Sequence, residues 1–90
     1  LMHYSPLKVA ENFKVLAALH PGRIDLGVGR APGSDGLTAA ALAYGSQIGI
    51  EYFPAKLGDL QAFLADRPPY TEAFARVVAT PRVDIAPELW

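Results

Sequence analysis

Residues 23–29 carry a strand signal between two stretches with helical periodicity, and this order of elements constrains the fold most. Apolar side chains alternate there with small or polar ones, the pattern of a strand with one buried face. The apolar face and the opposite face consist of alternate residues, respectively Ile24, Leu26, Val28 and Asp25, Gly27, Gly29. Two glycines on one face indicate either close approach of another backbone or room for a ligand beyond the strand.

The stretch before this strand predicts an amphipathic helix of about four turns. Ser5 can cap it through its hydroxyl, and Pro6 suits the first helical position. The predicted apolar face consists of Val9, Phe13 and Leu16, with Ala10, Ala17 and Leu19 beside it. The polar side chains fall mostly elsewhere, at Lys8, Glu11, Asn12 and Lys14. The helix is expected to end at residues 20–22, because proline and glycine there cannot continue it.

The stretch after the strand predicts a loop over residues 30–36 and a short alanine-rich helix over about 38–43, capped by Asp35 or Ser34. Pro54 is expected to open a helix of about 12 residues that ends near Asp66. Residues 44–53 are hard to assign. Residues 71–90 predict an ordered but irregular connection that leads toward a new strand.

A strand between helices is typical of parallel α/β architectures. We expect no partner for this strand within the chain, so that its backbone groups would be left unpaired. The missing strands must then come from elsewhere, and both ends of the sequence read as cuts through a larger domain. We therefore predict that residues 1–90 form a single incomplete domain that self-associates through its exposed edges and apolar faces.

Composition excludes several classes of protein. The 90 residues contain no cysteine and carry a formal net charge of -1, which rules out disulfide scaffolds and cysteine-ligated metal sites and disfavours a basic nucleic-acid binder. No apolar run approaches the length of a membrane span, and no signal peptide is evident. We expect a cytoplasmic protein without membrane contact. No metal site is expected either, because His3 and His20 lie far apart without carboxylates at ligand spacing.

The glycines of the strand do not form a dinucleotide-binding motif. That motif needs a third glycine three positions after the second, where this chain has Pro32, and it needs a helix that opens at once. Arg30 is more informative, because it follows the strand directly, at the carboxyl end where parallel α/β folds bind ligands. Its guanidinium can take a phosphate bidentately, or it can pair with Asp35 or a strand-end carboxylate.

Two further residues have open interpretations. His3 precedes a helix, and if Leu1 and Met2 end a strand, His3 and Arg30 project from neighbouring strand ends toward one cavity. Asp25 needs partners if it is buried, and Arg23 lies on the same face of the strand. A structural ion pair or inter-strand hydrogen bond is favoured for Asp25 over a role as general base.

Residues 3–11 and 19–33, which include Gly29-Arg30, closely resemble the bacterial luciferase-like flavin monooxygenases, nearest the alkanal-monooxygenase-like group. The resemblance continues through residues 51–54, 59–64 and 86–90. It implies that the chain is an internal fragment of a TIM (β/α)8 barrel. The fragment would hold the end of strand 3, helix 3, strand 4, helix 4 and the connection toward strand 5.

The resemblance further implies a parent monooxygenase that uses reduced FMN and molecular oxygen on a small organic substrate, with an aldehyde among the candidates. A flavin reductase would supply the reduced FMN. Arg30 and Gly29 would lie in the flavin-binding region, with Arg30 on the cofactor phosphate, and His3 would lie near the flavin. Luciferase has a reactive cysteine where this chain has Gly29, so light emission is not inferred. The catalytic residues stay unknown.

Two alternatives remain for the parent protein. It can use a deazaflavin in hydride transfer, as some members of the same superfamily do, or it can be a non-catalytic homologue or subunit. The 90 residues alone are expected to bind flavin weakly or not at all and to show no turnover.

Overall fold

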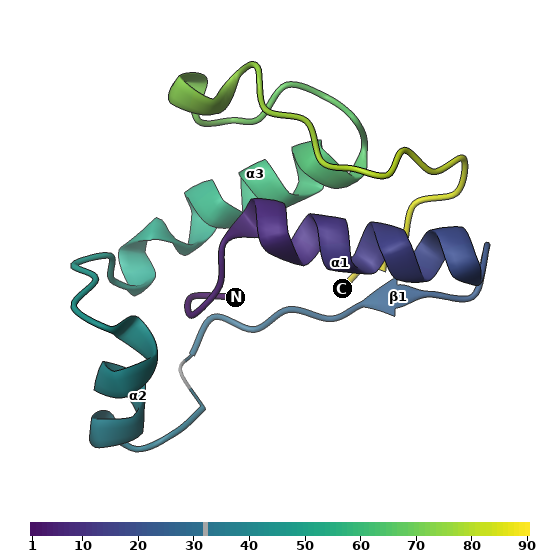
Figure 1. Cartoon of the computed structure of the whole chain (residues 1–90). Coiled ribbons are helices and arrows are strands. Elements are labelled where there is room, and N and C mark those ends of the chain that lie inside the picture. Colours follow the sequence, from purple (N-terminus) through teal and green to yellow (C-terminus); the bar gives the residue numbers. More distant parts are fainter. Residues whose placement is uncertain (32) are drawn as a thin grey trace.

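The computed structural model describes residues 1–31 and 33–90. Its main helices are α1 (Pro6–Leu19), α2 (Gly36–Ala43) and α3 (Phe53–Leu64), with single 3-10 turns η1 (Ile50–Tyr52) and η2 (Glu72–Phe74). The strands are β1 (Asp25–Leu26) and β2 (Glu88–Leu89). In Figure 1, α1 and α3 run side by side in the same direction, and β1 runs back the opposite way.

The helices begin where local signals predict. Ser5 caps α1, its Oγ accepting a hydrogen bond from Lys8 N at 3.3 Å, and α1 ends at Leu19 with Gly22 in the left-handed region (φ +73°). Asp35 is the cap of α2, because its carboxylate accepts from both Thr38 N and Thr38 Oγ1 at 2.9 Å. The predicted 12-residue helix at Pro54 is confirmed as α3.

The strand β1 has a parallel partner within the chain, which corrects the expectation of an unpaired strand. Asp25 lies opposite Glu88 and Leu26 opposite Leu89. Two further bonds extend the pairing, from Val28 N to Trp90 O (3.1 Å) and from Trp90 N to Leu26 O (2.9 Å). The expectation was wrong because the partner lies more than 60 residues along the chain. The regular strand is also shorter than the predicted 23–29, since these bonds cover only its central part.

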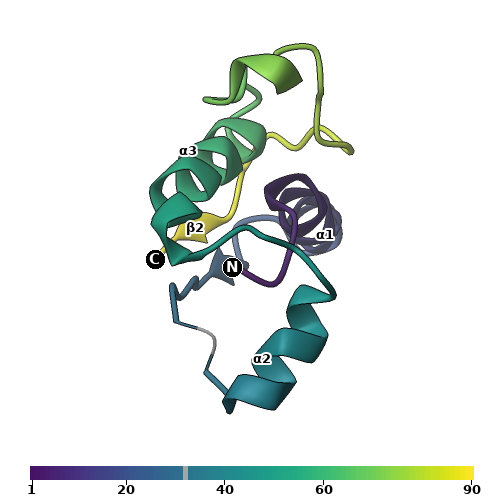
Figure 2. The same ribbon diagram turned by 90° about the vertical axis from the view of Figure 1, so that its left-hand side faces the viewer.

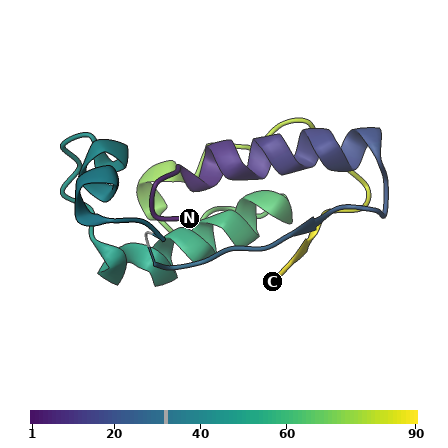
Figure 3. The same ribbon diagram turned by 90° about the horizontal axis from the view of Figure 1, so that it is seen from below.

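The other edge of the segment after β1 faces the start of the chain. Leu1 N donates to Gly29 O at 3.0 Å, and Met2 and His3 lie in a turn. Residues 1–3 therefore lie beside the end of this segment on the side away from β2, although they do not form a regular strand here. In Figure 3, which views the molecule from below, the segment that follows β1 passes in front of α3, and the N-terminus lies between this segment and α1.

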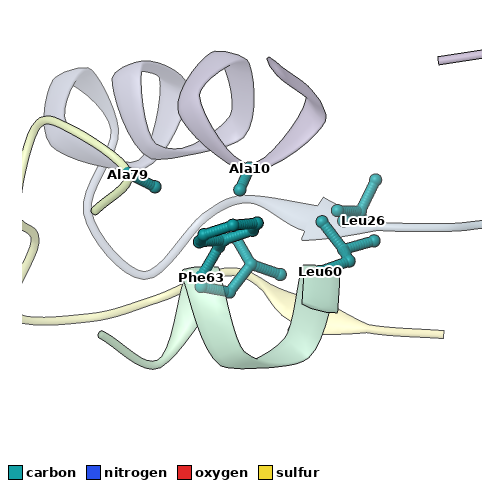
Figure 4. Packing of buried hydrophobic residues seen from close by; sticks show 6 residues of the cluster. Ala10, Leu26, Leu60, Phe63 and Ala79 are labelled. Atoms are coloured by element: carbon teal, nitrogen blue, oxygen red, sulfur yellow. The ribbon is translucent and has the colours of Figure 1, made fainter. Parts of the chain in front are cut away.

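The hydrophobic core lies between α1, α3 and β1. Its buried residues come from these elements and from the connection to β2: Ala10, Leu26, Leu60, Phe63, Leu64 and Ala79. Figure 4 shows the ring of Phe63 and the side chain of Leu60 directed from α3 toward Ala10 and Leu26. The core is therefore a helix pair packed on one face of β1, as a parallel α/β unit requires.

The buried face of α1 is rotated from the predicted one. Ala10, Lys14 and Ala17 are buried, whereas Val9 and Phe13 are half-buried and Leu16 is 40% exposed. Ala10 packs in the core with residues of α3, and Lys14 finds polar partners. Its Nζ lies 2.5 Å from Asp66 Oδ1 and 3.1 Å from Ala79 O. These bonds satisfy a cation that would otherwise be excluded from the interior.

The helix α2 stands apart at one end of the molecule (Figure 2). Within the described part of the chain, none of its side chains is buried, and Leu37 is 83% exposed. It ends at Ala43, and the residue that caps it, Tyr44, adopts the left-handed conformation (φ +45°). The segment from α2 to α3 therefore projects from the packed unit at the carboxyl end of β1. In the described residues, no helix is long and apolar enough to cross a membrane.

Candidate functional site

A cavity of about 770 Å³ opens where the amino ends of α1 and α3 meet α2. Its wall combines residues 2–6, parts of α2 and the segment that follows it, the first turns of α3, and Thr71 with Phe74. The volume lies within the range of small-molecule sites, and most of the wall is apolar. Apolar side chains such as Met2, Leu42, Ile48 and Phe74 line it beside a few polar groups.

His3 lies in the wall of this cavity and is partly buried. Leu1 N donates to Gly29 O, so the turn that carries His3 is adjacent to the segment that ends in Gly29 and Arg30. Arg30 is exposed and is not among the residues that line the cavity. The structure therefore brings the two segments together at their backbones. The prediction that the side chains of His3 and Arg30 project into one cavity is not met, because only His3 lines it.

Arg30 does not pair with Asp35 in this structure. Both carboxylate oxygens of Asp35 accept hydrogen bonds from Thr38 as the cap of α2. These bonds lower the pKa of Asp35, the backbone N–H of Thr38 having the larger effect and its hydroxyl the next. The loop predicted over 30–36 contains Pro32, which lies outside the described residues.

The two glycines after β1 have free space beside them. A Cβ added to Gly27 or Gly29 would meet no atom within 4 Å in the described part of the chain. Close approach of another described backbone is thus not the reason for glycine at these positions. Asp25, on the same face, is exposed and forms no ion pair with Arg23 among the described residues. The structural pairing favoured for Asp25 is therefore not observed, because this face of the strand is uncovered.

Two polar residues of the cavity wall were not singled out from the sequence. Lys56 Nζ donates to Leu1 O at 3.3 Å and to Met2 O at 3.2 Å, and burial lowers the pKa of this ammonium. Asp59 is buried and accepts from Thr71 N (2.7 Å) and Thr71 Oγ1 (2.6 Å). A signal for Asp59 existed, because it precedes Leu60 and lies four residues before Phe63 on the buried side of α3.

The two histidines lie at opposite ends of α1, His3 before it and His20 at its C-terminal cap. Helix α1 has 14 residues, so it spans about 20 Å. His20 is exposed at the turn that ends the helix, where its backbone N–H donates to Leu16 O.

Several known proteins that are similar to this chain carry monooxygenase names. The N-acetyl-S-alkylcysteine monooxygenase of Bacillus subtilis (strain 168) is 44% identical over 90 residues, which is 100% of this chain and 27% of that protein. A luciferase-like monooxygenase of Escherichia coli (strain K12) is 46% identical over 69 residues, or 77% of this chain and 21% of that protein. No protein-family model matches the sequence.

A solved structure is also similar to this chain. The crystal structure of apo-MsnO8 superposes with a TM-score of 0.74 at 38% identity, covering 99% of this chain and 24% of that one. The chain thus spans about a quarter of the length of the proteins that it matches.

Proposed function

The chain belongs to the luciferase-like monooxygenases, and on this basis we propose that the whole protein is a flavin-dependent monooxygenase. It would use reduced FMN to insert one atom of molecular oxygen into a small organic substrate, with an aldehyde among the candidates. The observation that carries this proposal is the 44% identity to a named monooxygenase over all 90 residues. A separate flavin reductase would supply the reduced cofactor.

We propose that the chain forms part of a (β/α)8 barrel. In this arrangement residues 1–2 end strand 3, α1 is helix 3, β1 belongs to strand 4, α3 is helix 4, and β2 begins strand 5. Support comes from the parallel pairing of β1 with β2 and from the contact of Leu1 with Gly29 on the other side. The uncovered face with Asp25, Gly27 and Gly29 would face the barrel interior. The cavity would lie at the carboxyl ends of the strands, where barrel enzymes place their active sites.

Residues after β1 fit a flavin phosphate. Arg30 is exposed and not paired with Asp35, so its planar group is available for bidentate contact with a phosphate. Gly29 leaves open space for a ligand to approach the backbone. His3 would lie near the flavin from the cavity wall. Bound reduced flavin supplies the electrons that activate oxygen, and the protein supplies orientation and a water-poor cavity.

Substitution of Arg30 tests the assignment. Arg30→Ala in the full-length protein should weaken FMN binding about ten- to hundredfold, the scale of a lost charge-assisted phosphate contact. Arg23→Ala is the matched control, because Arg23 is also exposed but lies at the other end of β1. Fluorescence titration with FMN measures both. Equal affinities for wild type and Arg30→Ala would contradict the phosphate contact.

The reaction itself is tested by oxygen consumption. The full-length protein with reduced FMN should consume oxygen in the presence of a substrate, with an aldehyde series as the first set of probes. Binding of a deazaflavin with no affinity for FMN would overturn the choice of cofactor. Absence of both cofactor binding and oxygen consumption would indicate a non-catalytic homologue. The isolated 90-residue chain serves as a negative control, for which we propose no turnover.

A further inference from the structure

We propose that Lys56 is a positioning residue that holds the turn carrying His3 against the first turns of α3 and so fixes His3 in the wall of the cavity. The inference rests on the proposed function, because it concerns the same site. It adds to the site a residue that approaches from a different element, about 50 positions along the chain from His3.

The contacts of Lys56 are specific to this turn. Its Nζ lies within hydrogen-bond distance of two consecutive carbonyls, Leu1 O at 3.3 Å and Met2 O at 3.2 Å. Leu1 O also accepts from Tyr4 N at 3.1 Å, the bond that closes the turn around His3. A single ammonium therefore binds the turn at the two residues that directly precede His3.

The same turn connects to the predicted phosphate-binding segment. Leu1 N donates to Gly29 O at 3.0 Å, and Arg30 is the next residue. Lys56 thus stands at one end of a chain of contacts that runs through Leu1 to Gly29. All the site residues predicted from the sequence, His3, Gly29 and Arg30, lie on the two segments that this chain of contacts joins.

The environment of Lys56 suits a structural cation. It lines the cavity with His3 and is partly buried. In the part of the chain that the structure describes, no carboxylate lies within salt-bridge distance of its Nζ. Nearby Asp59 uses both oxygens to accept from Thr71. Carbonyl oxygens are therefore the described partners of Lys56, and an ammonium, which has three donors, can bind both of them.

The test compares Lys56→Met, Lys56→Arg and Lys8→Met in the full-length protein. Methionine keeps the length of the side chain and removes the donors, arginine keeps a cationic donor, and Lys8 is an exposed lysine on α1 outside the cavity. The primary measurement is the NMR signal of the His3 imidazole, assigned from a His3→Gln variant. We expect it to shift in Lys56→Met, to return toward wild type in Lys56→Arg, and to stay in place in Lys8→Met.

A catalytic measurement accompanies the spectra. Misplacement of a site group by about an ångström lowers turnover on the order of a hundredfold. We therefore expect kcat for oxygen consumption to fall about ten- to hundredfold in Lys56→Met, with partial recovery in Lys56→Arg. The NMR measurement needs no flavin, so it tests the positioning of His3 even if the proposed monooxygenase function is wrong.

An unshifted His3 signal in folded Lys56→Met would overturn the proposal. If Lys56→Met does not fold, Lys56→Gln replaces it, because an amide can still donate one of the two hydrogen bonds. A smaller displacement of the His3 signal is then expected, and none would equally overturn the inference.

Discussion

Replacement of Lys14 by methionine tests the packing of the fold most directly. The Lys14 side chain is fully buried (0% exposed), and its Nζ joins α1 to Asp66, just after α3, and to Ala79 O in the connection to β2. Methionine has a similar length and keeps the apolar contacts of the lysine stem. The substitution therefore isolates the loss of the ammonium and leaves the shape of the core nearly unchanged.

The expected destabilisation follows from what is left without a partner. Removal of one member of a fully buried ion pair costs about 3–5 kcal/mol, because the other charge stays buried and uncompensated. The cost for Asp66 is smaller than for a fully buried carboxylate, since its side chain is 19% exposed and Arg82 Nε lies 3.9 Å from its Oδ1. The carbonyl of Ala79 also loses its charged donor. We therefore expect the free energy of unfolding to fall by about 2–3 kcal/mol.

Urea denaturation of the full-length protein measures this change. The control is Lys8→Met, on the exposed side of the same helix, which should change the free energy of unfolding by less than about 0.5 kcal/mol. A double-mutant cycle with Asp66→Asn separates the pair from the carbonyl bond, and asparagine tolerates the left-handed backbone of position 66 (φ +56°). If Lys14→Met were as stable as Lys8→Met, the argument that Lys14 attaches Asp66 and the connection at Ala79 to α1 would fail.

Two further predictions concern carboxylates that accept hydrogen bonds from threonine. Thr71→Val removes the hydroxyl that donates to buried Asp59 at 2.6 Å and should cost about 2 kcal/mol in urea denaturation, whereas Thr38→Val, at the exposed cap of α2, should cost clearly less. Glu11 Oε2 accepts from the backbone N–H and the hydroxyl of Thr80, and these bonds, the backbone one first, lower the pKa of Glu11. Because the folded-state pKa is lowered, the stabilisation is present above the ordinary glutamate range and is lost as pH falls through the folded-state value. Wild type should therefore lose more stability than Glu11→Gln between about pH 6 and about pH 3, and parallel pH profiles would contradict this.

The parts of the fold that the sequence predicts are those determined by near neighbours. Ser5 and Pro6 define the start of α1 because the cap and the first turn involve residues only three positions apart. Asp35 and Pro54 do the same for α2 and α3. The pairing of β1 with β2 could not be predicted in this way. A two-residue strand has too little pattern to identify a partner, and its register depends on how the intervening 60 residues pack.

In the candidate site too, the sequence predicts what depends on near neighbours and misses what depends on distant contacts. His3 was predicted to face a cavity because it lies between a strand end and a helix start, and it does line one. Arg30 was predicted for the same cavity, but its side chain is exposed and lies outside the cavity wall. Lys56 was missed because its partners are backbone carbonyls, which leave no signature in the sequence.

The buried face of α1 differs from the predicted one because the elements that pack against the helix decide which of its side chains are covered. Leu16 and Leu19, which the periodicity assigned to the apolar side, are 40% and 68% exposed, while Ala10 and Ala17 are buried. A helix in a barrel contacts the sheet and a helix on each side, so its apolar surface is wider than one packed neighbour can cover. In the proposed barrel, the helix that precedes α1 would cover Leu16 and Leu19. Both the predicted and the observed face of α1 would then be buried in the proposed barrel.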